Sequence, residues 1–329
     1  MSGAYSTGDD ETLTTGADGL IARFGFGIDG FASGDNPLWN WSNYSLADVR
    51  ARRAIEAVEA IPAVVRAALL APDQALYLDY DDGWLHGVIA DMHHRHYNEG
   101  QETGHFHFAF NDTDMVSARR HPLQSVDDVR HLIVQRKKAI HGPAELLELI
   151  MRHSLERLSR ELLGIGGQLD SIEDRVVADK WREEQARLNA ARRRLVFIHR
   201  HVAAIASLFR QVRHLQYDDL PEPVADMVDR LASRSEALLA DSEQIHSRAR
   251  LLQDELMAKL SAESNRLLYV LSVLTAMLLP TTIVSGLFGM NVGGVPLSQD
   301  PSGFWAISAL AVGLAAAVLL FVRRLRGKG

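Results

Sequence analysis

The chain has 329 residues, a formal net charge of −7 at pH 7 and no cysteine. Without cysteine it can form neither disulfides nor thiolate metal sites, and the acidic balance gives no sign of nucleic-acid binding. Its length is sufficient for one sizeable soluble domain together with a helical stalk and a membrane part.

Residues 1–16 are rich in glycine, serine, threonine and acids and contain no apolar run, so they are interpreted as a disordered tail without a signal peptide. Residues 17–142 predict an α/β domain. The motif Asp81-Asp82-Gly83 indicates a hairpin turn, and Ser45 is a candidate helix N-cap. The predicted strands are 20–26, 75–80, 84–91, 105–110 and 115–118, and the predicted helices are 45–58, 62–70 and 125–140.

Histidines form the strongest candidate metal site of this domain. After His93-His94-Arg95-His96, the chain carries His105 and His107 on one face of a predicted strand, with phenylalanines on the other face. Two imidazoles could then converge on one ion, and histidine is a common zinc ligand. The alternative is two histidines on the wet face of a half-buried sheet, which is the commoner situation.

Residues 143–266 predict a helical hairpin and a stalk. The first helix covers 144–163 and 168–180 and is loosened by the glycine-rich run 164–167. The next two helices carry apolar residues at alternating steps of three and four, which predicts long helices packed along one another. Because neither glycine nor proline occurs between Pro223 and Pro280, we expect one helix to run from the cytoplasm into the membrane.

Two stretches predict transmembrane helices. Residues 267–288 carry no formal charge, and at about 1.5 Å rise per residue they span a hydrocarbon core of about 30 Å. A second uncharged run covers 304–322, after the loop 289–303. Basic residues precede the first span and form the tail 323–329, which predicts a multi-pass protein of the lipid bilayer with both termini cytoplasmic.

One face of the first span is small and polar. At 100° per residue, a sector roughly 100° wide collects seven residues. This polar stripe consists of Asn265, Leu268, Ser272, Thr275, Leu279, Thr282 and Gly286. Such residues also let membrane helices pack closely, which is the alternative interpretation. Since two helices cannot enclose a pore, a stripe that lines water requires several copies of the chain around an axis.

The first span ends in Gly289-Met290-Asn291, followed by Val292-Gly293-Gly294-Val295-Pro296. This triplet after the first of two C-terminal spans, behind a large soluble region, resembles the CorA family of divalent-metal transporters. The Gly-Gly-hydrophobic-Pro run is most similar to the zinc-transporting ZntB branch. Magnesium-transporting relatives typically carry an acid soon after the triplet, whereas here the loop has none before Asp300.

The resemblance implies the fold class α+β, with a cytoplasmic α/β domain, long stalk helices and two C-terminal transmembrane helices. It also implies a homopentamer in a bacterial inner membrane that needs no cofactor and is not an enzyme. It further implies that Gly289, Met290 and Asn291 form the selectivity filter. From their residue types, Leu268, Leu271 and Leu279 are candidates for an apolar constriction, and the polar stripe is the candidate pore lining. For Asn291 the alternative is a helix C-cap. If the stripe is continued along the same helix face toward the cytoplasm, it reaches Asp254, which is a candidate for a cytoplasmic metal site.

The implied function is zinc uptake, a process associated with proton coupling in that branch. No residue of the polar stripe selects zinc, so a magnesium, cobalt or nickel channel of the same family is the alternative. An alternative of another class is a membrane-anchored metal sensor or scaffold that transports nothing. No nucleophile elbow, phosphate-binding loop or pair of catalytic acids supports an enzyme.

Overall fold

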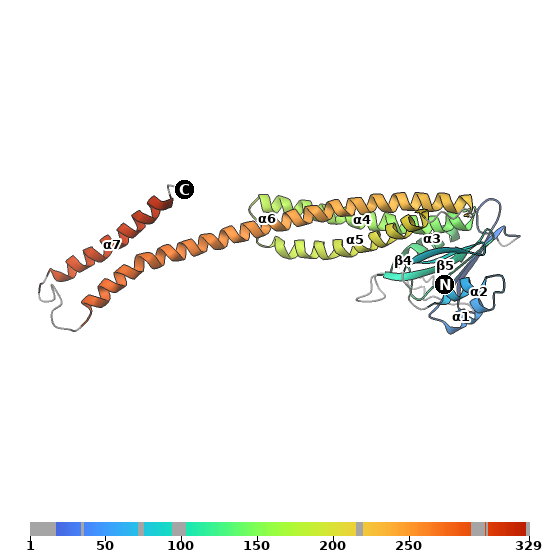
Figure 1. Cartoon of the computed structure of the whole chain (residues 1–329), viewed down its shortest axis with the longest axis horizontal. Coiled ribbons are helices and arrows are strands. Elements are labelled where there is room, and N and C mark those ends of the chain that lie inside the picture. Colours follow the sequence, from blue (N-terminus) through green and yellow to red (C-terminus); the bar gives the residue numbers. More distant parts are fainter. Residues whose placement is uncertain are drawn as a thin grey trace, which may run out of the picture. The chain divides into compact units, whose positions relative to one another are not determined.

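The computed structural model describes residues 18–33, 36–71, 76–93, 103–214, 220–290, 300 and 302–326 (Figure 1). The chain forms two compact units, Met1–Arg250 and Leu251–Gly329. One helix, α6, contributes to both. Each unit is described by itself below.

The first unit contains a six-stranded sheet in the order β1-β2-β6-β5-β4-β3. Neighbouring strands are antiparallel except for β2 and β6, which are parallel. The strands are β1 (Leu20–Phe26), β2 (Trp39–Ser45), β3 (Tyr77–Asp81), β4 (Trp84–Met92), β5 (Thr103–Phe110) and β6 (Asp114–Arg119).

The hairpin between β3 and β4 is a tight two-residue turn. Asp82 and Gly83 have φ of 48° and 80°, and Asp81 pairs directly with Trp84. Positive φ at both central residues is the geometry of a type I′ turn, for which Asp-Gly is a favoured sequence. The predicted hairpin is therefore confirmed.

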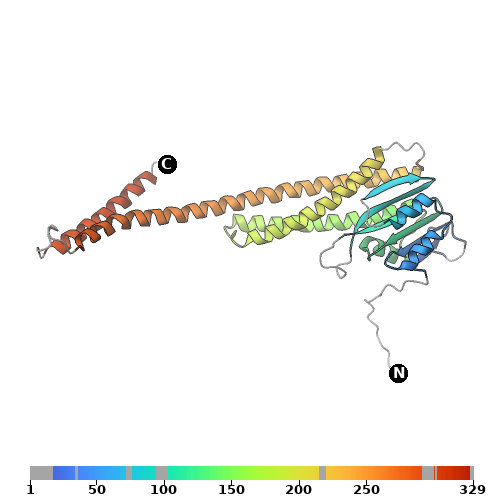
Figure 2. The same cartoon turned by 60° about the horizontal axis from the view of Figure 1, so that its bottom comes forward.

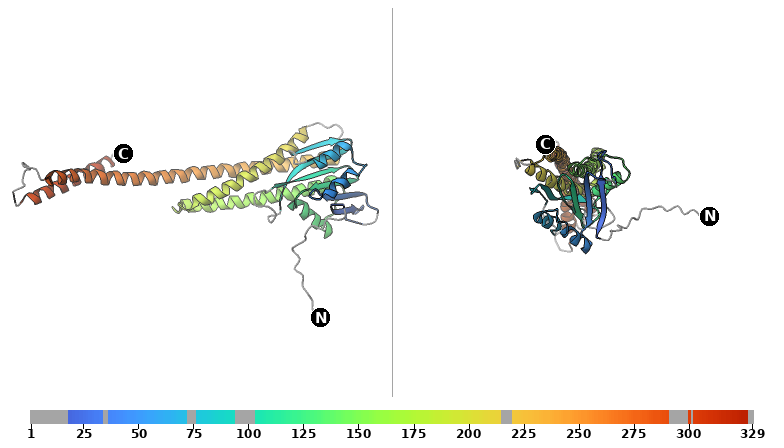
Figure 3. Two further views of the ribbon diagram at one scale, coloured as in Figure 1. Left: turned by 90° about the horizontal axis from the view of Figure 1, so that it is seen from below. Right: turned by 90° about the vertical axis from the view of Figure 1, so that its right-hand side faces the viewer.

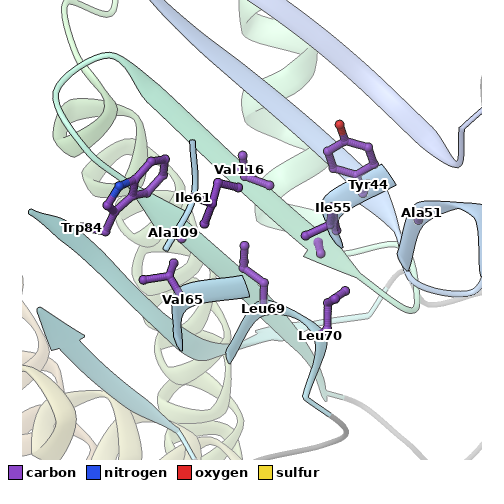
Figure 4. Close-up of a cluster of buried hydrophobic side chains, with 11 residues drawn as sticks. Tyr44, Ala51, Ile55, Ile61, Val65, Leu69, Leu70, Trp84, Ala109 and Val116 are labelled. Carbon is purple, nitrogen blue, oxygen red and sulfur yellow. The ribbon is translucent and has the colours of Figure 1, made fainter. Parts of the chain in front are cut away.

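Helices cover both faces of the sheet (Figure 1). On one face, α1 (Val49–Glu56) and α2 (Ala63–Leu70) pack on the strands through a buried apolar cluster, in which Ile55, Val65 and Leu69 meet Ala109 and Val116 (Figure 4). The other face lies toward α3 (Gln124–Val134) and the long helices. Each fully buried large apolar side chain contributes about 1.5–3 kcal/mol.

Three features of this unit differ from the sequence prediction. The strand β2 was not predicted, because its Asn and Ser residues hide the apolar pattern of Trp39 and Trp41. Ser45 ends β2, and the true N-cap of α1 is Asp48, which accepts a hydrogen bond from the backbone N–H of Arg50 at 2.9 Å. The helix α3 ends at Val134, before Arg136 with its φ of 50°, and does not reach residue 140.

The long helices are α4 (Pro143–Val177), α5 (Glu184–His214) and α6 (Glu222–Phe288). The predicted loosening of α4 at its glycines is wrong, because buried Leu162, Ile165 and Leu169 hold that stretch against the helices beside it. Within the first unit, Figure 3 shows α4, α5 and the first part of α6 running along one another. The single helix predicted from Pro223 onward is confirmed by the 67 residues of α6.

Ion pairs join α6 to the hairpin of α4 and α5. Arg230 contacts Glu148 on α4 at 2.9 Å, and Arg213 on α5 contacts Glu236 at 3.0 Å. Farther along, Arg248 contacts Asp170 and Glu173 of α4 at 2.7 and 2.9 Å. Most of these side chains are partly exposed, so the pairs set the register of the three helices more than they stabilise them.

The second unit contains the end of α6 and α7 (Gly303–Arg326), which runs back antiparallel to it (Figures 1 and 2). Among the described residues, α6 and α7 are the two helices long and apolar enough to cross a membrane. Pro280, which lies inside α6, does not end the helix.

Candidate ion path along the first apolar span

The end of α6 has one half-buried face. Its members are Val273, Met277, Pro280, Thr281, Val284 and Phe288. A corresponding half-buried face on α7 consists of Ile307, Ser308, Ala311, Leu314, Ala315, Val318, Leu319 and Val322. In a unit made of two apolar helices, these faces are the surface that the helices bury against each other. Val273, Met277 and Val284 therefore pack on protein.

The polar stripe lies on the opposite side of α6. All seven of its residues, Asn265 to Gly286, are exposed in the single chain. At 100° per residue the centre of the stripe is about 160° around the axis from the half-buried face. The small and polar residues are therefore not used to pack α6 on α7, although close packing was the alternative explanation for them.

The hydroxyl groups of the stripe are bonded to their own helix. Ser272 donates to the carbonyl oxygen of Leu268 at 2.8 Å, and Thr275 donates to that of Leu271 at 2.9 Å. Thr282 donates to the carbonyl oxygen of Leu278 at 2.8 Å. A hydroxyl has one hydrogen and two lone pairs, so each of these groups presents only hydrogen-bond acceptors to its surroundings.

Apolar side chains alternate with these acceptors. Leu268 and Leu279 are 57% and 60% exposed, and Leu271 at the edge of the stripe is 59% exposed. Among the described residues of α6 beyond Arg266, no side chain is charged. The face can therefore accept hydrogen bonds from water, but it cannot replace the water shell of a divalent ion with carboxylates or imidazoles.

The C-terminal end of α6 is described in part. The backbone N–H of Gly289 donates to the carbonyl of Ser285 at 2.9 Å, and Met290 is exposed. Asn291 and the Gly293-Gly294 run lie outside the described residues. Asp300 accepts hydrogen bonds from the backbone N–H and the hydroxyl of Ser302, and these bonds lower the pKa of its carboxyl group. Asp300, the acid of the loop, therefore forms its hydrogen bonds with the residue that precedes α7.

The structure does not add support for a cytoplasmic metal site at His105, His107 or Asp254. His107 is 1% exposed and belongs to the sheet face covered by α1 and α2, so the predicted wet face is wrong; His105 is half-buried. Asp254 is exposed on α6. Throughout the described ranges, no group of three or more His, Asp or Glu side chains is placed to hold a metal ion. His94 and His96 lie outside those ranges.

The family model described as CorA-like Mg2+ transporter protein matches residues 38–324. The chain belongs to this family. The CorA family is one of transporters rather than enzymes, and the two apolar C-terminal helices behind a soluble domain agree with a membrane protein of this kind.

Several curated CorA relatives are similar to the chain. The divalent cation transporter CmaX of Pseudomonas aeruginosa is 31% identical over 216 residues, which are 64% of each chain. The zinc transport protein ZntB of Pectobacterium carotovorum is 24% identical over 216 residues, or 65% of this chain and 64% of the relative. The cobalt/magnesium transport protein CorA of Methanocaldococcus jannaschii is 23% identical over 221 residues, or 63% and 65%. The chain thus spans less than two thirds of the length of these relatives.

Solved structures of CorA relatives share the fold. The full-length CmaX structure has a TM-score of 0.72 and 24% identity, with 98% of this chain and 100% of that chain covered. The complete structure of the CorA magnesium transporter from Methanocaldococcus jannaschii has a TM-score of 0.73 and 17% identity, with coverage of 92% and 96%. The predicted fold class, a mixed sheet followed by long helices and two apolar C-terminal helices, is confirmed.

Proposed function

We propose that the chain transports divalent metal cations through an axial pore formed by the α6 helices of several copies. The observation that carries this proposal is the position of the polar stripe. It lies opposite the face that α6 buries with α7, so a ring of copies can turn their stripes to a shared axis while α7 stays on the outside. A pentamer is the assembly that the family resemblance implies.

The chemistry of the stripe suits a hydrated cation. Water molecules around a metal ion point their oxygens at the metal and their hydrogens outward. The hydroxyl oxygens of Ser272, Thr275 and Thr282 present acceptors to such hydrogens, because their own hydrogens are bonded to the helix. In this proposal the ion keeps its inner water shell, and exposed Leu268, Leu271 and Leu279 close the pore by dewetting.

We place the selectivity filter at Gly289, Met290 and Asn291, at the outer end of α6. In a ring of copies the Asn291 amide would contact the hydrated ion before it enters. The basic residues Arg266, Arg323 and Arg324 at the other ends of the spans favour cytoplasmic termini in an inner membrane. Inward flux is then favoured by the membrane potential, which is worth about 4.6 kcal/mol per 100 mV for a divalent ion.

Zinc is the proposed cargo, on the basis of the Gly293-Gly294 run after the triplet. The names of the relatives include divalent cations, zinc, and cobalt with magnesium. A magnesium, cobalt or nickel channel is the alternative within the family, and a membrane-anchored scaffold is the alternative outside it. Proton coupling would have to use groups outside the spans, since the described residues of the two spans contain no Asp, Glu, His or Lys between 267 and 288 or between 304 and 322.

The experiment is metal uptake by the purified chain in liposomes, with zinc, magnesium, cobalt and nickel in parallel arms, each with and without a pH gradient. We expect saturable divalent flux and a preference for zinc. Zinc flux that does not exceed magnesium flux would move the assignment to the alternative within the family. No divalent flux from a correctly assembled oligomer would favour the scaffold.

The variant Asn291→Ala tests the filter. We expect flux to fall about tenfold or more, because each copy loses the amide that contacts the ion's water shell at the mouth. Native mass spectrometry should show an unchanged oligomer. Unchanged transport by this variant would remove the filter from the proposal.

A further inference from the structure

Two histidines meet where α5 packs on α6 in the first unit. The ring centroids of His199 on α5 and His246 on α6 are 6.0 Å apart, and the ring planes are tilted by 42°. His199 also contacts Ser242 on α6, with 2.8 Å between Nδ1 and the hydroxyl oxygen. Both imidazoles are half-buried, and neither residue has a role in the proposed pore.

The hydrogen-bond chain fixes the proton of His199. Ser242 donates its single hydroxyl hydrogen to the carbonyl oxygen of Leu239 at 2.8 Å. At 2.8 Å from His199, the same oxygen can therefore only accept, so Nδ1 of His199 must carry a hydrogen. In the neutral ring, Nε2 then carries a lone pair and no hydrogen.

His246 has a nitrogen that is poorly placed for a charge. Its Nδ1 is buried, and within the described residues it has no hydrogen-bond partner. Burial lowers the pKa of His246, and His199, Arg250 and Arg192 lower it further. The carboxylates that α4 presents to this part of α6, Asp170 and Glu173, are already paired with Arg248. An added proton therefore enters a positive neighbourhood.

We propose that the contact of His199, Ser242 and His246 is a pH-sensitive latch between α5 and α6. The latch is closed while the imidazole of His246 is neutral and loosens when that ring binds a proton. Because α6 continues without a break to Phe288, the helix that the latch holds is the one that carries the polar stripe. The effect of the latch on transport rests on the proposed function, whereas the latch itself does not.

The direction of the pH dependence follows from the lowered pKa of His246. The unfolded or opened state binds a proton more readily than the packed state, so the contact contributes its full stability above the ordinary pKa of 6.5. That contribution is lost as the pH falls from there toward the lower pKa of the packed state. His201 on α5 does not share this window, because burial lowers its pKa to about 4.

The test is hydrogen exchange of the full chain in lipid nanodiscs at about pH 7.5 and about pH 5.5, after correction for the intrinsic pH dependence of exchange. We expect peptides of α5 and α6 around the latch to exchange roughly threefold faster or more in acid. His246→Gln should abolish this increase. The matched control is His153→Gln, which removes a half-buried histidine on α4 and should leave the increase intact.

The second variant is His199→Asn, whose side-chain amide can still donate to Ser242 but which removes the ring that lies against His246. It should also abolish the acid-induced increase, so it decides the matter if His246→Gln does not fold. An increase that persists in either variant, or is missing from the unmodified chain, would overturn the latch. Exchange is measured on the protein itself, so absence of metal flux would contradict the proposed function and not this inference.

Discussion

At the scale of single residues, the chemistry of the proposed pore depends on hydroxyl groups on the exposed face of α6. A serine or threonine in an apolar helix avoids an unsatisfied hydrogen by donating it to the carbonyl four residues earlier. Ser272, Thr275 and Thr282 all do so, which leaves their lone pairs directed away from the helix. The same bond makes these residues compatible with lipid, so the bond alone does not identify a pore.

Thr281 and Thr282 provide a matched pair for this question. Both are bonded to their own helix, at 3.2 and 2.8 Å, but Thr281 is half-buried and outside the polar stripe whereas Thr282 belongs to it. Thr282→Val should lower metal flux about fivefold, since a net hydrogen bond is worth about 1 kcal/mol. Thr281→Val should leave flux near that of the unmodified chain. Equal effects of the two variants in the liposome assay would contradict the assignment of the face.

The residues that sequence reasoning missed have partners far away in the chain. His199 and Ser242 are separated by 43 positions, and no local spacing signals that their helices place them together. His105 and His107 show the converse error. Their alternation with phenylalanine correctly predicted a strand, but the sequence does not reveal that helices cover both faces of the sheet. Local patterns predict the element, and packing decides the surroundings of its side chains.

At the scale of elements, glycines illustrate the same limit. The sequence predicted that the run 164–167 loosens α4, yet the helix continues through it. Gly164 is exposed, and a Cβ added there would meet no atom within 4 Å. In β4, by contrast, a Cβ on Gly87 would lie 2.4 Å from the carbonyl oxygen of Tyr77 on β3. One glycine is merely tolerated, and the other is required by a neighbouring strand.

The two glycines should therefore respond oppositely to alanine. Gly164→Ala should stabilise α4 by about 1 kcal/mol, because alanine is the better helix former. Gly87→Ala should destabilise the sheet by about 1–3 kcal/mol, because the neighbouring backbone must shift. Thermal unfolding of the detergent-solubilised chain measures both variants. A rise in melting temperature for Gly87→Ala would show that the close approach of β3 and β4 is not needed.

Long helices were the elements best predicted from the sequence. The absence of glycine and proline between Pro223 and Pro280 correctly indicated one helix, because nothing in that stretch interrupts the backbone hydrogen bonds. The strand β2 could not be predicted in the same way, since polar side chains occupy most of the positions beside Trp39 and Trp41. Its place between β1 and β6 depends on partners from both ends of the domain.

For the whole molecule, the continuity of α6 joins the two units mechanically. At about 1.5 Å per residue the helix is about 100 Å long. A stiff helix can transmit a change in the first unit to the spans, provided that the first unit has two states, as the proposed latch would supply. Interrupting the helix between the two units therefore tests this coupling in the whole chain.

Ala258→Pro should uncouple the two units. Ala258 is exposed on α6, beyond the division between the units, and proline there breaks the helix locally at a cost of about 3 kcal/mol. We expect metal flux to persist but to lose its response to cytoplasmic pH. Ala258→Gly is the control, because it weakens the helix by about 1 kcal/mol without removing a hydrogen-bond donor. A proline variant with an unchanged pH response would show that the signal takes another route.

The helix-bonded hydroxyls also bear on which sign of charge the proposed conduit admits. Around chloride or another anion, the water molecules turn their hydrogens inward and leave oxygen lone pairs on the outside of the hydrated sphere. A wall that offers oxygen lone pairs repels such a sphere, whereas it solvates the oppositely oriented sphere of a cation. The conduit can thus discriminate against anions through the orientation of water alone, without a formal charge on the polar stripe.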